Sequence, residues 1–294
     1  HTLWAAMLLE LRLADTGLIC YGSNQRTASG KLMTALGLPT YEAPYKPLFP
    51  LSSYALAADR HMTQFGTTRE QLADVAVAAR AWAQKNPEAF IRDPLTREDV
   101  IASRLVSDPL RVRDCCLVTD GGGALVMRRA ETAKDHPRPP VYLLGGGEGT
   151  THRDISEMPD LTVTGAAQSG ATAMKMAGVK PADIDVVQLY DAFTINVILF
   201  LEDLGFCKKG EGGAFVENGG IAPGGHLPVN TNGGGLSCVH PGMYGIFTLV
   251  EAVRQLRGDA GDRQIDGAEL AMAHGNGGVL SSQVTNILGT ESTL

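Results

Sequence analysis

The stretch that decides the fold, Leu227–Gly258, reads LPVNTNGGGLSCVHPGMYGIFTLVEAVRQLRG. Its first part is rich in glycine, and in its second part, Met243–Leu256, apolar residues recur at helical spacing. Dense glycine usually marks backbone in unusual conformations or backbone against a ligand, although a mobile surface loop is the alternative. His240 stands between the two parts and is followed by Pro241 and Gly242. A histidine fixed by such a rigid corner is a candidate catalytic residue.

On both sides of this stretch, strands and helices alternate. Short apolar runs predict strands at Leu18–Tyr21, Asp114–Met127, Val141–Leu144, Ile184–Leu189, Leu270–Ala273 and Val279–Ile287. A glycine turn at 120–123 divides the second of these runs. Helical spacing predicts further helices at Thr2–Leu13, Thr67–Gln84, Ser169–Ala177 and Thr194–Leu204. A Thr68–Gln71 capping box opens the second of these helices, and residues from about 27 to 60 read as irregular. The alternation indicates stacked α/β layers.

Composition limits the class of protein. The chain has 294 residues, 44% of them hydrophobic and 19% charged, which is typical of a folded globular protein. A net charge of −7 argues against nucleic acid as a partner. Five cysteines without a CxxC pair predict free thiols in a reducing cytoplasm and no metal site. No apolar run is long enough to span a bilayer. Because the chain starts at His1 with a helix-like run, we expect a segment before it.

Two further segments offer candidate residues. His274 lies in AMAHGNGG, after an apolar strand and before a glycine turn, where a structural histidine is an equal alternative. Tyr190 opens the sequence YDAF between a strand and a helix. There, Asp191 is expected to cap the helix and Phe193 to lie in the core. Gly145–Gly149 follows a strand, but no helix or distal acid completes a dinucleotide motif.

Taken in order, these segments resemble the thiolase superfamily, specifically its lipid-transfer-protein or sterol-carrier-protein thiolase-like branch. The matching pieces are SDPLRVRDCCLVTDGGGALVM, DIDVVQLYDAFTINVILFLEDLGFCKKGEGGAFV, Leu227–Gly258 and ELAMAHGNGG. The resemblance implies an α/β fold of five α-β-α-β-α layers with an inserted loop domain. It assigns residues 1–150 to the remainder of an N-terminal half, with the insertion at about 27–110, and residues 151–294 to a C-terminal half.

The same resemblance implies roles for individual residues. His240 matches the histidine of the GHP-type motif and could donate a hydrogen bond to a thioester oxygen. Tyr190 replaces the asparagine of the NEAF-type motif, where its phenol could act as a donor or weak acid. His274 replaces the cysteine of the CxG-type motif and could transfer a proton at the substrate's α carbon. Four residues are expected to contact the substrate: Gly235, Tyr244, Gly275 and Gly277.

The nucleophilic cysteine of thiolases should lie just before the helix that begins at Thr2, and therefore upstream of His1. None of the five visible cysteines takes its place: Cys20, Cys115, Cys116, Cys207 and Cys238. The residue at that position decides whether acyl transfer can be covalent. Without a cysteine, the site could still stabilise enolates and would favour aldol-type cleavage.

The leading function that the resemblance implies is thiolase-type acyl transfer in lipid, sterol or related acyl-CoA metabolism. The reaction would be either thiolysis of a 3-oxoacyl-CoA or the reverse Claisen condensation. The alternatives are a retro-aldol lyase that cleaves a hydroxyacyl-CoA side chain and a non-catalytic acyl-CoA- or lipid-binding subunit. The coenzyme A thioester is expected as substrate, with no bound cofactor. A homodimer or tetramer is expected, with a possible zinc-ribbon/OB-fold (DUF35-type) partner subunit.

Overall fold

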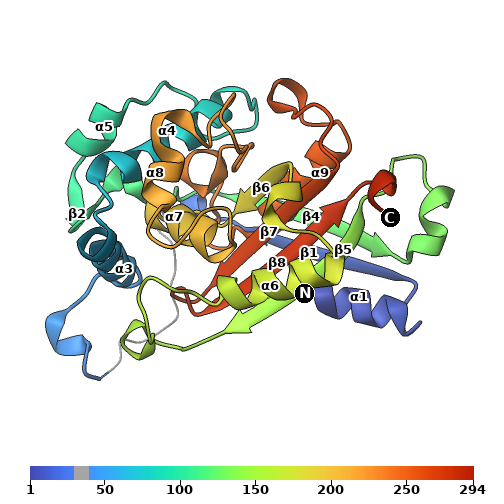
Figure 1. The fold of residues 1–294 in the computed structure, drawn as a ribbon, viewed down its shortest axis with the longest axis horizontal. Coiled ribbons are helices and arrows are strands. Elements are labelled where there is room, and N and C mark those ends of the chain that lie inside the picture. The colour runs from blue at the N-terminus through green and yellow to red at the C-terminus, as the bar shows by residue number, and fades with distance from the viewer. Residues whose placement is uncertain (30–39) are drawn as a thin grey trace.

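The computed structural model describes residues 1–29 and 40–294, so part of the predicted irregular segment, at 30–39, lies outside the described residues. Helices and strands alternate along the chain (Figure 1). The helices are α1 Thr2–Glu10, α2 Gln25–Ser29, α3 Leu51–Phe65, α4 Arg69–Gln84, α5 Arg97–Ala102, α6 Ala166–Ala177, α7 Thr194–Asp203, α8 Gly212–Val216 and α9 Gly245–Leu256. The strands are β1 Thr16–Ser23, β2 Leu105–Ser107, β3 Leu110–Arg111, β4 Gly121–Arg128, β5 Tyr142–Thr150, β6 Val186–Leu189, β7 Leu270–Gly277 and β8 Ser282–Gly289.

The main sheet has the strand order β5-β8-β7-β6, with β6 parallel to β7 and the other pairs antiparallel. All four residues of β6 are buried, as expected for a strand covered by helices on both faces. Val187 and Leu189 pack into the cluster that contains α7, whereas Val186 packs with Leu256 of α9. The sheet therefore separates two apolar layers.

Further layers lie beyond this sheet. Gly146 of β5 faces Leu3 of α1, whereas the neighbouring Gly145 and Gly147 face α6, so α1 and α6 cover opposite faces. α9 also contacts β4, which forms a two-stranded antiparallel ribbon with β1. The described layers are thus the ribbon, α1 with α9, the main sheet, and α6 with α7 (Figure 1). α3, α4 and α5 gather to one side, within the range predicted for the insertion.

Two predictions about glycine runs are wrong. Gly121–Gly123 is not a turn after a strand at 114–119, because these glycines belong to β4 and pair with Ser23, Gly22 and Tyr21 of β1. Gly145–Gly149 lies inside β5 instead of after a strand that ends at Leu144. Glycine is needed there for close packing, since a Cβ on Gly145 would lie 2.2 Å from the carbonyl oxygen of Ala173 in α6.

Other expectations met mixed outcomes. The capping box at Thr68 is confirmed, whereas residues 51–60, predicted to be irregular, belong to α3. β7 continues to Gly277, so His274 lies within a strand and not after one. β1 is only half covered: Leu18 is 65% exposed, although Leu18–Tyr21 reads as a buried run. The division at residue 150 stays a prediction; the main sheet already begins at Tyr142.

Candidate active site

A cavity of about 1110 Å³ opens where β6 and β7 end and where α3, β1 and the segment before α9 meet them. Its wall is mostly apolar, with side chains such as Phe49, Leu51, Phe193, Ile246 and Val279. The polar groups on this wall come from distant parts of the sequence; they include Tyr54, Cys116, Tyr190, His240 and Asn276. An apolar cavity with a few convergent polar groups is typical of a small-molecule site.

His240 reaches the cavity from a tightly anchored backbone. Its N–H donates to Thr119 Oγ1 at 3.0 Å, and its carbonyl accepts the Thr119 N–H at 3.3 Å. The side chain is 3% exposed, and neither ring nitrogen has a hydrogen-bond partner among the described residues. Burial lowers the pKa of His240 from 6.5 to about 4. The ring is therefore neutral near pH 7, with one N–H donor and one bare nitrogen left for a ligand.

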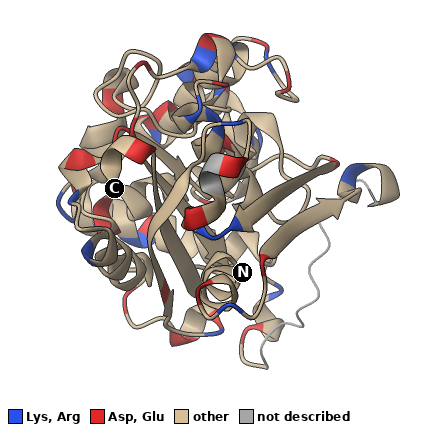
Figure 2. Ribbon diagram, turned by 90° about the vertical axis from the view of Figure 1, so that its right-hand side faces the viewer, with Lys and Arg blue, Asp and Glu red and all other residues tan. Residues whose placement is uncertain are grey.

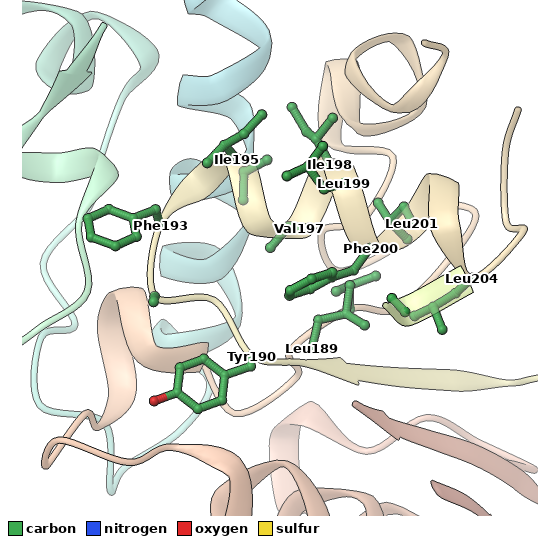
Figure 3. Packing of buried hydrophobic residues seen from close by; sticks show 14 of the residues in the cluster. Leu189, Tyr190, Phe193, Ile195, Val197, Ile198, Leu199, Phe200, Leu201 and Leu204 are labelled. Carbon is green, nitrogen blue, oxygen red and sulfur yellow. The ribbon is translucent and has the colours of Figure 1, made fainter. Parts of the chain in front are cut away.

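Tyr190 lies beside His240, their ring centroids 5.6 Å apart in an edge-on arrangement. It follows the last residue of β6, and its phenol oxygen points away from the α7 side chains (Figure 3). That oxygen accepts the Tyr244 backbone N–H at 3.2 Å, so its own proton is free for a ligand. Burial holds the pKa of Tyr190 far above its usual value of 10, which makes the group a hydrogen-bond donor and not a base at pH 7.

Asp191 has a positioning role that the sequence did not reveal. The predicted helix cap is wrong, because the N-cap of α7 is Phe193 and the Asp191 carboxylate points elsewhere. It accepts the N–H groups of Gly235 at 2.6 Å and Leu236 at 3.3 Å, at the start of the π-helical turn Gly234–Cys238 that leads to His240. A Cβ on Gly234 would lie 2.0 Å from this carboxylate. The sequence signal that could have revealed this role is the glycine run at 233–235, because a side chain on Gly234 would collide with the buried carboxylate.

The structure does not bring every predicted site residue to the cavity. Gly275 and Gly277 line it, together with His240 and Tyr190, whereas Gly235, Tyr244 and His274 are not part of its wall. Gly235 packs instead against the His240 ring: a Cβ built on this glycine would lie 3.1 Å from His240 Cδ2. The Tyr244 ring is fully buried and donates its hydroxyl to Asn232.

The half-buried cysteines beside this cavity are poor nucleophiles. Cys115 and Cys116 line it, but burial raises the pKa of Cys115 to about 12 and that of Cys116 well above 9. Cys20 also lines it, from β1. Cys207 and Cys238 lie elsewhere, and burial raises the pKa of each to about 12. The five sulfurs are free thiols.

The pKa shifts predict how stability depends on pH. His240 and His274 are held near pKa 4 in the folded state but near 6.5 when unfolded, so the unfolded state binds more protons between these values. Each histidine therefore makes the free energy of unfolding fall as the pH drops from 6.5 to 4. Asp191 opposes them, because burial raises its pKa to about 7.

His274→Gln isolates one of these contributions. The difference in unfolding free energy between wild type and variant should shrink by roughly 3 kcal/mol from pH 6.5 to pH 4, measured by urea denaturation. The same substitution at the exposed His136 is the control for the change of side chain itself. If the unfolding free energies of wild type and His274→Gln change in parallel with pH, the lowered pKa assigned to folded His274 is wrong.

Charges of both signs are mixed over one side of the molecule (Figure 2). Lys and Arg are interspersed with Asp and Glu over the side seen in Figure 2. Within the described ranges, no group of three or more His, Cys, Asp or Glu side chains is arranged to hold a metal ion. In the same part of the chain, no helix is both long and apolar enough to cross a membrane.

Known proteins share this sequence pattern and fold. Residues 147–290 match the family described as thiolase C-terminal domain-like. The chain is 42% identical over 249 residues to the acetyl-CoA acetyltransferase of Methanothermobacter thermautotrophicus, covering 84% of this chain and 65% of that protein. It is 36% identical over 290 residues to the steroid side-chain-cleaving aldolase of Thermomonospora curvata, covering 93% and 73% respectively. Relatives named sterol carrier protein 2 also match.

A solved structure described as an Ltp2-ChsH2(DUF35) aldolase superposes with a TM-score of 0.89 at 32% identity, covering 99% of this chain and 76% of that one. The chain therefore belongs to the thiolase superfamily. The predicted thiolase-like α/β fold and the predicted sterol-carrier-protein thiolase-like branch are both confirmed. The relatives are thiolase-like enzymes, and both predicted activities, acyl transfer and side-chain cleavage, occur in their names.

Proposed function

We propose that this chain makes or breaks the bond between C2 and C3 of a coenzyme A thioester, through an enolate of the thioester. The observation that carries the proposal is His240: a neutral, buried imidazole on a cavity wall, with both nitrogens unpartnered among the described residues and a phenol beside it. Buried polar atoms are normally hydrogen-bonded, so such a ring is built for a ligand. The cavity's apolar wall suits an acyl chain.

Retro-aldol cleavage is the direction that the residues support best. The 3-hydroxyl of a hydroxyacyl-CoA gives its proton to the bare nitrogen of His240, and the C3–O bond becomes a carbonyl as the C2–C3 bond breaks. The electron pair moves onto C2 and the thioester oxygen, where the Tyr190 hydroxyl donates to the enolate. The imidazolium then returns the proton to C2. The products are an aldehyde or ketone and a shortened acyl-CoA.

Acyl transfer is the second candidate, supported by the acetyltransferase relative and by the His240-Pro241-Gly242 corner that matches the thiolase motif. In thiolysis, a thiol gives its proton to His240 while its sulfur adds to the C3 carbonyl of a 3-oxoacyl-CoA. The C2–C3 bond then breaks, which leaves C3 as a new thioester and C2 in the same enolate, and the imidazolium returns the proton to C2. A covalent acyl intermediate needs a thiolate, which the half-buried Cys115 and Cys116 do not supply, because the pKa of each thiol is raised. The non-catalytic binding subunit is the remaining alternative.

Two assays separate these functions. The protein is incubated with a 3-hydroxyacyl-CoA, and release of aldehyde or ketone is measured; in parallel, it is incubated with a 3-oxoacyl-CoA and free CoA, and loss of the substrate is followed. We expect carbonyl release in the first assay. Turnover in the second assay alone would select acyl transfer, and inactivity in both assays would overturn the enzymatic proposal.

The remaining expectations belong to the same proposal. The coenzyme A thioester is the substrate and no resident cofactor takes part, with both catalytic groups supplied by His240 and Tyr190. A zinc-ribbon/OB-fold (DUF35-type) subunit is the proposed partner, supported by the superposed aldolase, whose name joins Ltp2 to ChsH2(DUF35). A homodimer or tetramer in the cytoplasm completes the proposal. The proposed role of His274 is to position other groups.

A further inference from the structure

A line of side-chain hydrogen bonds runs from the buried His274 to the cavity wall. His274 Nδ1 bonds Thr285 Oγ1 at 2.9 Å, and Nε2 bonds Gln283 Oε1 at 3.0 Å. Gln283 Nε2 donates to Asn276 Oδ1 at 2.8 Å, and Asn276 Nδ2 donates to the Tyr54 hydroxyl at 2.9 Å. His274 and Gln283 are fully buried, whereas Asn276 and Tyr54 line the cavity.

One end of this line fixes the direction of every bond in it. The Tyr54 hydroxyl bonds the carbonyl oxygen of Gly278 at 3.2 Å, and a carbonyl can only accept. Tyr54 must therefore donate there and accept from Asn276. Because the Asn276 nitrogen donates to Tyr54, the Asn276 oxygen accepts from the nitrogen of Gln283. The Gln283 oxygen then faces His274 and accepts from it. The imidazole must therefore carry a proton on Nε2. Burial lowers the pKa of His274 to about 4, so near pH 7 Nδ1 is bare and accepts from Thr285 Oγ1.

Asn276 keeps one hydrogen-bond donor for the cavity. An amide nitrogen has two N–H groups, and Tyr54 takes one of those on Asn276. Its oxygen is held by Gln283, so the amide cannot turn over without breaking two bonds. The second N–H has no partner among the hydrogen bonds of the described residues, and Asn276 lies on the cavity wall. The wall thus carries a donor of fixed orientation.

We propose that the Asn276 amide donates a hydrogen bond to the C3 oxygen of the coenzyme A thioester, and that His274 and Gln283 are the positioning residues that aim it. This inference rests on the proposed function. It assigns substrate recognition to Asn276, where the sequence pointed to His274.

The strand order supports this placement. β6 and β7 are parallel neighbours, and the Tyr190 N–H donates to the His274 carbonyl at 3.0 Å. Tyr190 follows the last residue of β6, whereas β7 continues past His274 to Gly277, so Asn276 lies further along the strand, beyond the end of β6. Both residues line the same cavity, so Tyr190 can serve the thioester oxygen while Asn276 serves the C3 oxygen.

A site of this kind selects oxygenated chains. An acyl chain without a C3 oxygen leaves the aimed N–H of Asn276 without a partner, which costs affinity. Two thioesters that differ by one hydroxyl test this: 3-hydroxydecanoyl-CoA and decanoyl-CoA, with dissociation constants measured by isothermal titration calorimetry. Wild type should bind the hydroxylated ester about tenfold more tightly.

The variants then locate the source of the preference. In Asn276→Ala the preference should fall below about threefold, through weaker binding of 3-hydroxydecanoyl-CoA and unchanged binding of decanoyl-CoA; the bond from the 3-hydroxyl to His240 accounts for what remains. Gln283→Leu frees the Asn276 amide to turn and should reduce the preference to about threefold. Gln168→Leu, the same substitution at an exposed position of α6, should keep the wild-type preference.

The outcomes separate this inference from the function on which it rests. A wild type that binds neither ester removes the proposed function and the inference with it. A wild type that binds both esters equally, or an Asn276→Ala variant that keeps the tenfold preference, overturns the inference alone. If Asn276→Ala does not fold, an undiminished preference in Gln283→Leu overturns it as well.

Discussion

Replacing His240 with Ala is expected to lower kcat by about a thousandfold or more while the substrate dissociation constant changes by less than about threefold. The imidazole supplies the proton acceptor for the reacting oxygen, and both of its nitrogens are unpartnered among the described residues. Most of the affinity comes from the apolar wall, which the substitution leaves in place. The measurement is steady-state kinetics combined with calorimetric binding.

His136→Ala, at an exposed position, is the matched control and should behave as wild type. The pH profile gives a second check on His240. Because burial lowers its pKa to about 4, kcat should stay level from pH 7 to pH 5 and fall only as the imidazole is protonated below that range. A His240→Ala variant with wild-type kcat would exclude the enzymatic roles given to this residue.

Tyr190→Phe is expected to lower kcat by about a hundredfold with little change in KM. The substitution removes one hydroxyl, keeps the ring in its edge-on contact with His240, and deletes the donor to the enolate oxygen. The effect falls on kcat because the charge on that oxygen develops only in the transition state. Initial rates over a range of substrate concentrations separate the two constants.

The control for this variant is Tyr142→Phe, which removes a hydroxyl from a buried tyrosine in β5, away from the cavity wall. Its kcat and KM should match the wild-type values. An equal loss of kcat in both tyrosine variants would show that lost packing, and not the Tyr190 hydroxyl, explains the result.

Sequence was sufficient where a residue's role depends on its neighbours along the chain. The capping box at Thr68 and the helical spacing of α9 are local patterns, and both were predicted correctly. His240 and Tyr190 were also brought to one wall, as the motifs indicated. Roles that depend on partners from distant segments were missed. Asp191 looks like a cap in sequence, and its true partners, Gly235 and Leu236, are set by tertiary folding.

The position of His274 shows the same limit. The glycines after it read as a turn, which would have put its ring at an exposed strand end. The sheet instead extends β7 to Gly277 by pairing with β8, and this pairing buries the ring against Phe200. Strand length beyond a glycine depends on the partner strand, which local propensity does not reveal.

The glycines of β5 have a mechanical consequence. A Cβ on Gly145, Gly147 or Gly149 would lie within 2.5 Å of a backbone oxygen of α6 or its N-cap. The three oxygens belong, in the same order, to residues 173, 169 and 165, which are about one helical turn apart. Steps of two along the strand thus match steps of four along the helix. If α6 slid along the strand by a single residue, all three of these close contacts would be lost at once. Strand and helix therefore form one stiff unit. Movements that admit a substrate must therefore arise in other elements of the chain.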